Sequence, residues 1–217
     1  MFYTEILNKI NRKECWPMVV VDGVVGVGKT TLMNILCEEF GYKPFLEPVV
    51  DNPILDKFYY DRQRYSFSLQ IFFLNNRFRM IKEAASIENA ILDRSIYGDL
   101  IFAKMLMESN EMSIEEYDLY IDLFENMIEH CHPPKLMIYL ETSVDCAINK
   151  INRRGRDYEK IVEKSYWQRL NNHYSNYFDS YNISPLLRIN VDNLDFENRE
   201  EDRKYVIDLI KSKLAQI

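Results

Sequence analysis

The chain is 217 residues long, 47% of them hydrophobic, and carries a formal net charge of −7. This length suits one large domain with its own core, so we expect a single unit over residues 1–217. The acidic charge argues against binding polymeric nucleic acid, and no apolar run reaches the roughly 18 residues that span a bilayer. These properties exclude a nucleic-acid coat and a membrane span, and they favour a cytoplasmic location.

The N-terminal segment, residues 1–17, contains an acid at Glu5 and lacks the long apolar core of a secretory signal. Its apolar residues recur near helical spacing and predict a short amphipathic helix as an N-terminal extension: Phe2, Ile6, Leu7 and Ile10. The cysteines are scattered along the chain and form no CxxC pair, which favours free thiols in a reducing compartment: Cys15, Cys37, Cys131 and Cys146.

Beyond this extension, short apolar runs alternate with segments of helical periodicity. The runs predict five buried strands, at residues 18–21, 44–46, 90–92, 136–140 and 186–191. Helices are predicted at 29–40, at 65–87, from a capping box at 113 towards 130, from about 144, at 161–181 and at the C-terminus. Tyrosines on one face of 161–181 indicate core or interface packing. The alternation indicates an α/β fold with a doubly wound, five-stranded parallel sheet.

The segment between the first strand and the first of these helices matches the pattern G-x-x-x-x-G-K-[ST]. Its residues run Gly23, Val24, Val25, Gly26, Val27, Gly28, Lys29 and Thr30, with Thr31 following. In this strand–helix context, backbone N–H groups wrap phosphates and the helix N-terminus adds its positive end. Lys29 is expected to reach the β- and γ-phosphates, and the Thr30 hydroxyl is expected to ligate Mg²⁺. The pattern therefore predicts a nucleoside triphosphate site.

A P-loop alone leaves three classes open: a GTPase switch, a mechanical ATPase and a small-molecule kinase. A GTPase should carry D-x-x-G, which this sequence lacks, and Asn149-Lys150-Ile151-Asn152 lacks the final carboxylate that reads guanine. A mechanical ATPase usually has a longer chain and arginines that face a partner. The remaining motifs favour a kinase.

Polar residues follow the second and third predicted strands: Glu47 after the second, and Asp93-Arg94-Ser95 at the end of the third. Ligands of parallel α/β sheets bind beyond the carboxyl ends of the strands, so these residues should share a crevice with the P-loop. Glu47 can accept the proton of an attacking hydroxyl. Arg94 can bridge that carboxylate and the negative charge developing on a phosphoryl group. Taken alone, the same residues also suit a surface ion pair.

Six segments in order make this sequence resemble the deoxynucleoside kinase family. They are GVVGVGKTT, EPV, FSLQ at 67–70 followed by Arg77 on the same predicted helix, DRSIYGD, RRGRDYE and VDNLDF at 191–196. The resemblance covers almost the whole chain from Met18 onwards. It implies a P-loop nucleoside kinase fold and direct in-line transfer of the γ-phosphate of ATP, with Mg²⁺, to the 5′-hydroxyl of a deoxynucleoside. It also implies a homodimer packed through helices, which the tyrosine-rich face at 161–181 would suit.

The resemblance further implies roles for individual residues in the acceptor site. Glu47 is implied to be the general base, with Asp93 in a Mg²⁺-side or proton-accepting role, and the sequence does not separate these two carboxylates. Gln70 is implied to hold the base through paired amide hydrogen bonds. Arg77 and Asp99 are implied to form a charged pair at the far end of the base pocket.

Other roles implied by the resemblance concern the sugar, the lid and the adenine of ATP. Tyr59 and Glu159 are implied to bind the 3′-hydroxyl, with the Tyr59 ring crowding the place of a 2′-hydroxyl. Residues 150–159 resemble the family lid, and Asp195 and Phe196 are implied to touch the adenine. The basic groups of the lid are Lys150, Arg153, Arg154 and Arg156, which on composition alone also fit a solvated basic turn.

Two departures from the family pattern affect these roles. Many members carry Glu in place of Asp93 and Arg in place of Lys150; the shorter Asp93 favours a metal-side role, and Lys150 offers a point charge only. The Arg77/Asp99 pair resembles the branch that accepts purines and cytosine, and DRSIYGD and RRGRDYE favour deoxyguanosine or deoxyadenosine.

Two alternatives to a deoxynucleoside kinase stay open. A nucleoside monophosphate kinase of the thymidylate kinase type would need extra cations near Glu47, which EPVVDNP does not offer. A nucleotide-binding subunit without turnover would not need the combination of Lys29, Glu47, Arg94 and the lid arginines.

Overall fold

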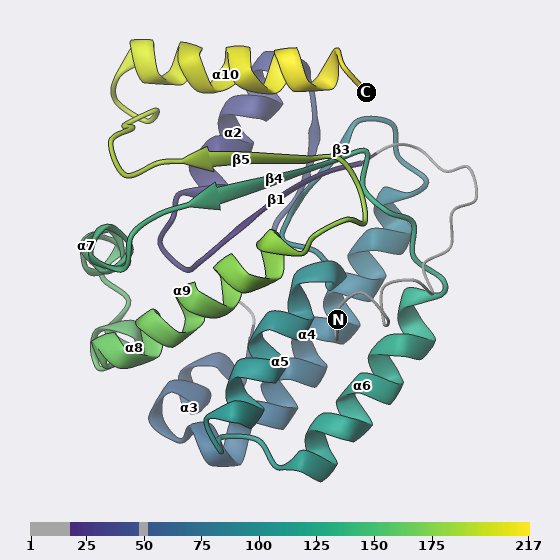
Figure 1. The fold of residues 1–217 in the computed structure, drawn as a ribbon, viewed down its shortest axis with the longest axis vertical. Coiled ribbons are helices and arrows are strands. Elements are labelled where there is room, and N and C mark those ends of the chain that lie inside the picture. Colours follow the sequence, from purple (N-terminus) through teal and green to yellow (C-terminus); the bar gives the residue numbers. More distant parts are fainter. Residues whose placement is uncertain (1–17, 48–51) are drawn as a thin grey trace.

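The computed structural model describes residues 18–47 and 52–217. The N-terminal helix predicted within residues 1–17, together with Pro48 and Val49 of the EPV motif, lies outside the described residues. The described part contains a five-stranded, all-parallel sheet in the order β2-β3-β1-β4-β5 (Figure 1). Its strands are β1 Val19–Gly23, β2 Lys43–Phe45, β3 Ala90–Asp93, β4 Leu136–Glu141 and β5 Leu186–Asn190. The predicted α/β fold with a doubly wound sheet is confirmed.

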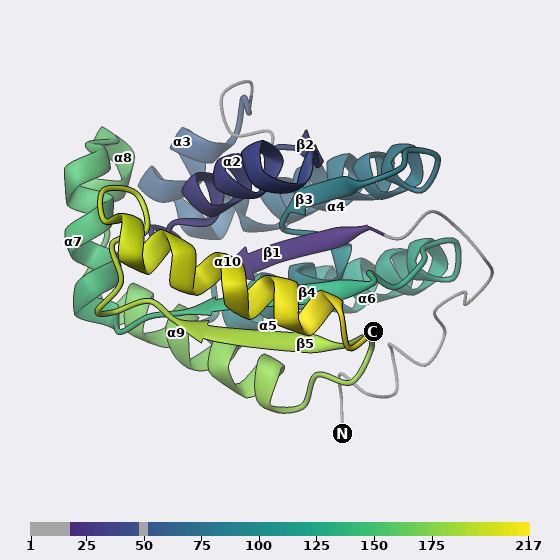
Figure 2. The same cartoon turned by 90° about the horizontal axis from the view of Figure 1, so that it is seen from above.

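Helices cover both faces of the sheet (Figures 1 and 2). One face carries α2 (Lys29–Phe40) and α10 (Glu200–Leu214), and the other carries α4 (Arg62–Ala84), α5 (Asp99–Glu108), α6 (Ile114–Ile128) and α9 (Lys164–Asp179). Three short helices, α3 (Leu55–Tyr60), α7 (Val144–Arg154) and α8 (Asp157–Lys160), lie towards the carboxyl ends of the strands. None of the helices in the described part combines the length and apolar character needed to cross a membrane.

The central strand β1 places the P-loop in the middle of the carboxyl edge. All its residues are buried between β3 and β4, and Val21 stands in register with Asp93 on one side and Ile138 on the other. A strand that is covered on both faces has a continuous apolar run in its sequence, which is why this strand could be predicted from the sequence. The residues that follow β1, β2 and β3 therefore leave the sheet at the same edge.

Several predicted boundaries shift, and three α-helices of the described part, α3, α5 and α8, were not predicted. The helix predicted at 65–87 begins at Arg62, where the Asp61 side chain accepts a hydrogen bond from the Arg64 N–H, and it ends at Ala84. The predicted capping box of α6 is present, with Ser113 and Glu116 bonded reciprocally. Helix α5 was missed because its sequence, DLIFAKMLME, is apolar on most sides, so it shows little amphipathic contrast.

The tyrosine face of α9 lies in the core, so its proposed contribution to a dimer interface is wrong. Tyr166, Tyr174 and Tyr177 are each at most 1% exposed. Tyr174 stacks on Tyr139 of β4 and meets Phe102 of α5 edge to face, with ring centroids 6.3 and 5.9 Å apart. The stripe is the surface with which α9 covers the sheet.

Candidate active site

The P-loop is a tight turn that its glycines make possible. Gly26 and Gly28 have φ angles of 82° and 110°, in the left-handed region where side chains are strained. A Cβ at Gly26 would lie 2.8 Å from the carbonyl oxygen of Ala147, so only glycine lets the loop approach α7 this closely. The Lys29 ammonium donates to the carbonyls of Gly23 and Val24, both at 3.1 Å, and therefore lies over the loop.

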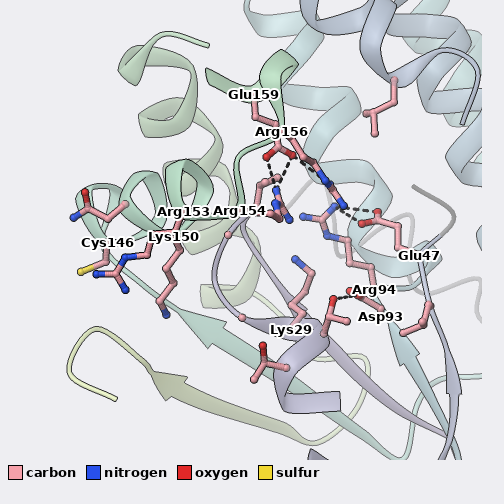
Figure 3. Close-up of a pocket in the computed structure, with 18 of the residues that line it drawn as sticks. Lys29, Glu47, Asp93, Arg94, Cys146, Lys150, Arg153, Arg154, Arg156 and Glu159 are labelled. Atoms are coloured by element: carbon pink, nitrogen blue, oxygen red, sulfur yellow. Dashed lines mark hydrogen bonds and ion pairs between the residues drawn. The ribbon is translucent and has the colours of Figure 1, made fainter. Parts of the chain in front are cut away.

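A cavity of about 850 Å³ opens beside the P-loop, and its walls come from segments far apart in the sequence (Figure 3). All but four of the expected site residues line it, and they include Lys29, Thr30, Thr31, Glu47, Tyr59, Gln70, Arg77, Asp93, Arg94, Lys150, Arg154, Arg156, Glu159, Asp195 and Phe196. The volume falls within the range of small-molecule sites. Of the expected residues outside the P-loop, Asp99 alone is not among the lining residues and lies behind Arg77.

Glu47 is clamped by two arginines. It accepts a hydrogen bond from Arg94 Nη1 at 3.1 Å and a second from Arg77. Burial by itself would raise the pKa of Glu47, but the charges of Arg94, Arg77 and Lys29 outweigh burial and lower that pKa to about 2. Glu47 is thus a carboxylate at any physiological pH.

Asp93 lines the cavity next to the P-loop threonine. Its Oδ2 accepts a hydrogen bond from the Thr30 hydroxyl at 3.0 Å, while its buried Oδ1 has no hydrogen-bond partner in the described part of the chain. Burial raises the pKa of Asp93, partly countered by Lys29. One unpaired carboxylate oxygen beside a hydroxyl fits Mg²⁺, which usually takes one or two protein oxygens and completes its shell with phosphates and water. No larger cluster of metal-binding side chains occurs among residues 18–47 and 52–217.

The inner end of the cavity is polar but closed. Gln70 is 2% exposed and Asp99 is fully buried. The Arg77 guanidinium is paired with Asp99 on one side and Glu47 on the other, and lies 4.7 Å above the Phe73 ring. The expected Arg77–Asp99 pair is therefore present, and the same arginine also reaches the carboxylate at the cavity floor, a contact that the sequence did not predict.

The segment expected to be a lid carries a second charged cluster. Glu159 accepts hydrogen bonds at 2.6 Å from Arg154 and also faces Arg156 at 3.4 Å. Tyr59 stacks on Tyr158, with ring centroids 5.4 Å apart. The stacked rings thus join α3 to α8, and the pair of Arg154 with Glu159 joins α7 to α8.

Lys150 does not point at the lid arginines. Its ammonium donates to the Val27 carbonyl of the P-loop at 3.2 Å. Phe196 lies next to the other side of the loop, since a Cβ at Gly28 would lie 3.2 Å from its ring. The P-loop is therefore held between α7 and the segment after β5.

Some lining residues were not predicted. Asp192 accepts hydrogen bonds from the Thr142 hydroxyl at 2.7 Å and the Ser143 N–H at 2.8 Å, and so ties the ends of β4 and β5 together. Its place directly after a strand was the available signal. Leu55 and Phe58 also line the cavity, but they belong to α3, which is too short to show a period.

A P-loop after the central strand, facing a carboxylate–arginine pair across one cavity, defines a P-loop kinase of the nucleoside kinase fold. The sequence profile of the family described as "Deoxynucleoside kinase" matches residues 19–215, and the chain belongs to this family. It is 38% identical over 209 residues to a deoxyguanosine kinase of Lactobacillus johnsonii, covering 92% of this chain and 93% of the relative.

Two other relatives extend this similarity. A deoxyadenosine/deoxycytidine kinase of Bacillus subtilis is 40% identical over 202 residues, covering 90% of this chain and 92% of the relative. A solved structure of deoxyadenosine kinase from M. mycoides, with dCMP and dCDP bound, superposes with a TM-score of 0.82 at 32% identity. That match covers 92% of this chain and all of the solved chain.

Proposed function

We propose that this chain transfers the γ-phosphate of ATP to the 5′-hydroxyl of deoxyguanosine or deoxyadenosine in a Mg²⁺-dependent reaction. The observation that carries the proposal is that Lys29 of the P-loop and Glu47 after β2 line one cavity, where their charges interact (Figure 3). One wall can hold the donor triphosphate and the other the acceptor hydroxyl. Relatives named as deoxyguanosine and deoxyadenosine kinases support the choice of a purine.

In this proposal Glu47 orients the acceptor hydroxyl and takes its proton. A carboxylate with a pKa of about 2 is a weak base. In a loose phosphoryl-transfer transition state, however, the hydroxyl keeps its proton until late, and positioning contributes most of the rate. Arg94, bonded to Glu47, would stabilise the charge on the phosphoryl group as it moves. We assign Asp93 to the metal side, because its Oδ2 is already bonded to Thr30.

The remaining site residues would bind the two substrates. Gln70 would hold the base, with the Arg77–Asp99 pair beyond it, and Tyr59 with Glu159 would hold the 3′-hydroxyl. On the donor side, Thr30 and Asp93 would hold Mg²⁺, which neutralises phosphate charge when bound. Charge on the donor would also be met by Lys29 and the lid cations, and the adenine would be met by Asp195 and Phe196; the lid cations are Lys150, Arg154 and Arg156.

We further propose a single cytoplasmic domain that forms a homodimer. The exposed apolar side chains Ile114 and Leu119 on α6, 66% and 58% exposed, support a helical interface. Light scattering coupled to size exclusion would measure the mass in solution. A monomer at assay concentration would contradict the dimer and leave the kinase proposal intact.

The proposed function is tested by assaying the purified chain with Mg·ATP against the four common deoxynucleosides. We expect deoxyguanosine or deoxyadenosine to have the highest kcat/KM. Thymidine as the best substrate would contradict the assigned base pocket. A deoxynucleoside monophosphate as the preferred acceptor would instead support the thymidylate kinase alternative.

Base preference should depend on the Arg77–Asp99 pair. Replacing both residues with alanine removes two opposite charges together, so that neither is left buried and alone. We expect the ratio of kcat/KM for the preferred purine over thymidine to fall about ten- to a hundredfold, because the polar partners of the base are lost. A control pair is Arg62 of α4 with Glu111, joined at 2.7 Å, whose double alanine variant should keep the ratio. An unchanged ranking in the Arg77/Asp99 variant would contradict the role.

Binding of ATP should weaken at alkaline pH. Burial, followed by repulsion from Arg94, lowers the pKa of Lys29 to about 8. A lysine with a lowered pKa loses its positive charge as the pH rises through that value, and the phosphates then lose a cation. From pH 7 to 9, at constant free Mg²⁺, we expect the Kd for ATP to rise about tenfold, measured by titration calorimetry. The Lys29→Arg variant keeps its charge and should vary less; an equal pH dependence would contradict the prediction.

A further inference from the structure

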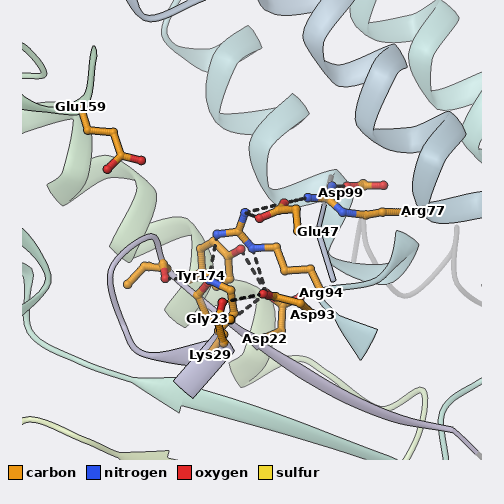
Figure 4. Close-up of polar contacts among 12 residues, drawn as sticks. Asp22, Gly23, Lys29, Glu47, Arg77, Asp93, Arg94, Asp99, Glu159 and Tyr174 are labelled. Carbon is orange, nitrogen blue, oxygen red and sulfur yellow. Dashed lines mark hydrogen bonds and ion pairs between the residues drawn. The ribbon is translucent and has the colours of Figure 1, made fainter. Parts of the chain in front are cut away.

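Behind Arg94, on the side away from the cavity, lies a buried pair of polar residues to which the proposed reaction gives no role. They are Asp22, next to last in β1, and Tyr174 of α9 (Figure 4). We propose that Asp22 and Tyr174 are positioning residues that fix the Arg94 guanidinium for phosphoryl transfer. This inference rests on the proposed kinase function and adds to it two residues that do not touch either substrate.

The Asp22 carboxylate is held on several sides. It is fully buried, and its Oδ1 accepts hydrogen bonds from the Gly23 N–H at 2.7 Å and the Tyr174 hydroxyl at 3.2 Å. Its Oδ2 lies against the backbone of Gly98, where a Cβ would approach to 2.4 Å. Gly98 thus lets the segment before α5 close over the carboxylate. These contacts leave Asp22 little freedom to rotate.

The same carboxylate faces the back of the Arg94 side chain. Its Oδ1 lies 3.6 Å from Arg94 Nε, while Arg94 Nη1 bonds Glu47 at 3.1 Å and Nη2 bonds the Gly23 carbonyl at 3.2 Å. The Phe102 ring lies 5.1 Å from the guanidinium carbon. The planar guanidinium is therefore oriented from three edges and one face, and Asp22 supplies the only one of these contacts that comes from a carboxyl group outside the cavity.

Backbone strain at Arg94 adds to the need for such support. Its φ angle is 62°, in the left-handed region that non-glycine residues adopt only when their surroundings hold them there. The side chain starts from this unusual backbone position and must still point at Glu47. The Asp22 carboxyl group behind Nε fixes that direction.

The Tyr174 hydroxyl contacts Asp22, whereas the Tyr174 ring packs against other aromatic side chains. Burial raises the pKa of Tyr174 well above its usual value, so its hydroxyl is a neutral donor to Asp22. The ring packs against Tyr139 and Phe102, contacts that phenylalanine would keep. Removing the oxygen alone therefore releases the Asp22 carboxylate while leaving the packing of α9 intact.

The neighbouring Tyr177 provides a matched control. It lies one turn further along α9, is 1% exposed, and donates its hydroxyl to the Tyr97 carbonyl at 2.6 Å instead of to Asp22. Changing either tyrosine to phenylalanine removes one buried hydrogen bond. Only Tyr174→Phe removes a bond made to the Asp22 carboxyl group itself, so a purely structural role predicts similar kinetics for both variants.

The experiment compares steady-state kinetics of Tyr174→Phe, Asp22→Asn and Tyr177→Phe with the wild type, using the best deoxynucleoside and Mg·ATP. We expect kcat to fall about tenfold in Tyr174→Phe and about a hundredfold in Asp22→Asn, with both KM values nearly unchanged. Tyr177→Phe should keep the wild-type kcat. Equal values of kcat in the two phenylalanine variants would overturn the inference.

A coupling test shows whether the effect passes through Arg94. Lysine has no planar guanidinium to orient. In an Arg94→Lys background, Tyr174→Phe should therefore change kcat less than about twofold. A full tenfold effect in that background would overturn the inference even if Asp22→Asn failed to fold. A wild-type chain without activity on any deoxynucleoside would refute the proposed function itself, whereas an active wild type with unchanged variants would refute only the positioning role.

Discussion

Replacing Glu47 with glutamine is expected to lower kcat about a thousandfold, in the range that a general base contributes, with the affinity for ATP nearly unchanged. The amide has the shape of the carboxylate but neither its charge nor its ability to take a proton. Glu47 bonds Arg94 and Arg77 rather than the P-loop backbone, so the donor site should keep its geometry. Single-turnover kinetics at saturating ATP, together with calorimetric titration of ATP, would separate chemistry from binding.

Glu111 offers a matched control for Glu47. Each carboxylate side chain is 12% exposed and bonds an arginine, Glu111 doing so with Arg62 at 2.7 Å. Glu111→Gln should therefore report the general effect of neutralising a largely buried carboxylate, and its kcat should stay near that of the wild type. If Glu47→Gln kept its kcat while Asp93→Asn lost it, the proton acceptor would be Asp93. If neither change affected kcat, both assignments would be wrong.

The fold was predictable because its signals are local. The strand 18–21 is readable from four adjacent apolar residues, and the P-loop from a pattern of eight, GVVGVGKT, that includes both turn and helix start. Helix α5 gave no such signal, because it is largely enclosed by neighbours and its sequence is apolar on most sides. Helix α3, of six residues, is too short for a period to appear.

The meeting of the site residues at one edge was also predictable, because parallel strands end together. The individual contacts were not, since they depend on side-chain packing between distant segments. Arg77 was expected to pair with Asp99, but its second contact with Glu47 links residues 30 positions apart. The bond from Tyr174 to Asp22 spans 152 positions, and no pattern in the sequence connects the two.

Arg94 is the residue whose loss should affect both stability and rate. In Arg94→Met the Glu47 and Asp22 carboxylates lose a cation that lies within 3.6 Å of both. Leaving a buried charge without its partner costs roughly 3–5 kcal/mol, so the free energy of unfolding should fall by about that amount. Methionine and arginine are similarly strained at a φ of 62°, so backbone strain would not explain a lower free energy of unfolding in the variant. Urea denaturation monitored by fluorescence would measure the free energy of unfolding of both proteins.

The catalytic effect of Arg94→Met should be separable from this loss of stability. Without the guanidinium, we expect kcat to fall about a hundred- to a thousandfold at a temperature where the variant is fully folded. Arg188 is the matched control, since it pairs with Asp179 at 2.8 Å and lies 5.8 Å from the Tyr139 ring, outside the cavity lining. Arg188→Met should keep the wild-type kcat, and an equal loss there would refute the assignment.

The pH profile of Arg94→Met should show how Arg94 controls Glu47. Among the charges that lower the pKa of Glu47 against the effect of burial, Arg94 is the largest. With Arg94 gone, burial opposes fewer positive charges, and the pKa of Glu47 must move up from about 2. A carboxylate is protonated below its pKa, so the acidic limb of kcat/KM should move to higher pH in the variant. If the acidic limbs of variant and wild type coincide, Glu47 is not the group that must be ionised for the reaction.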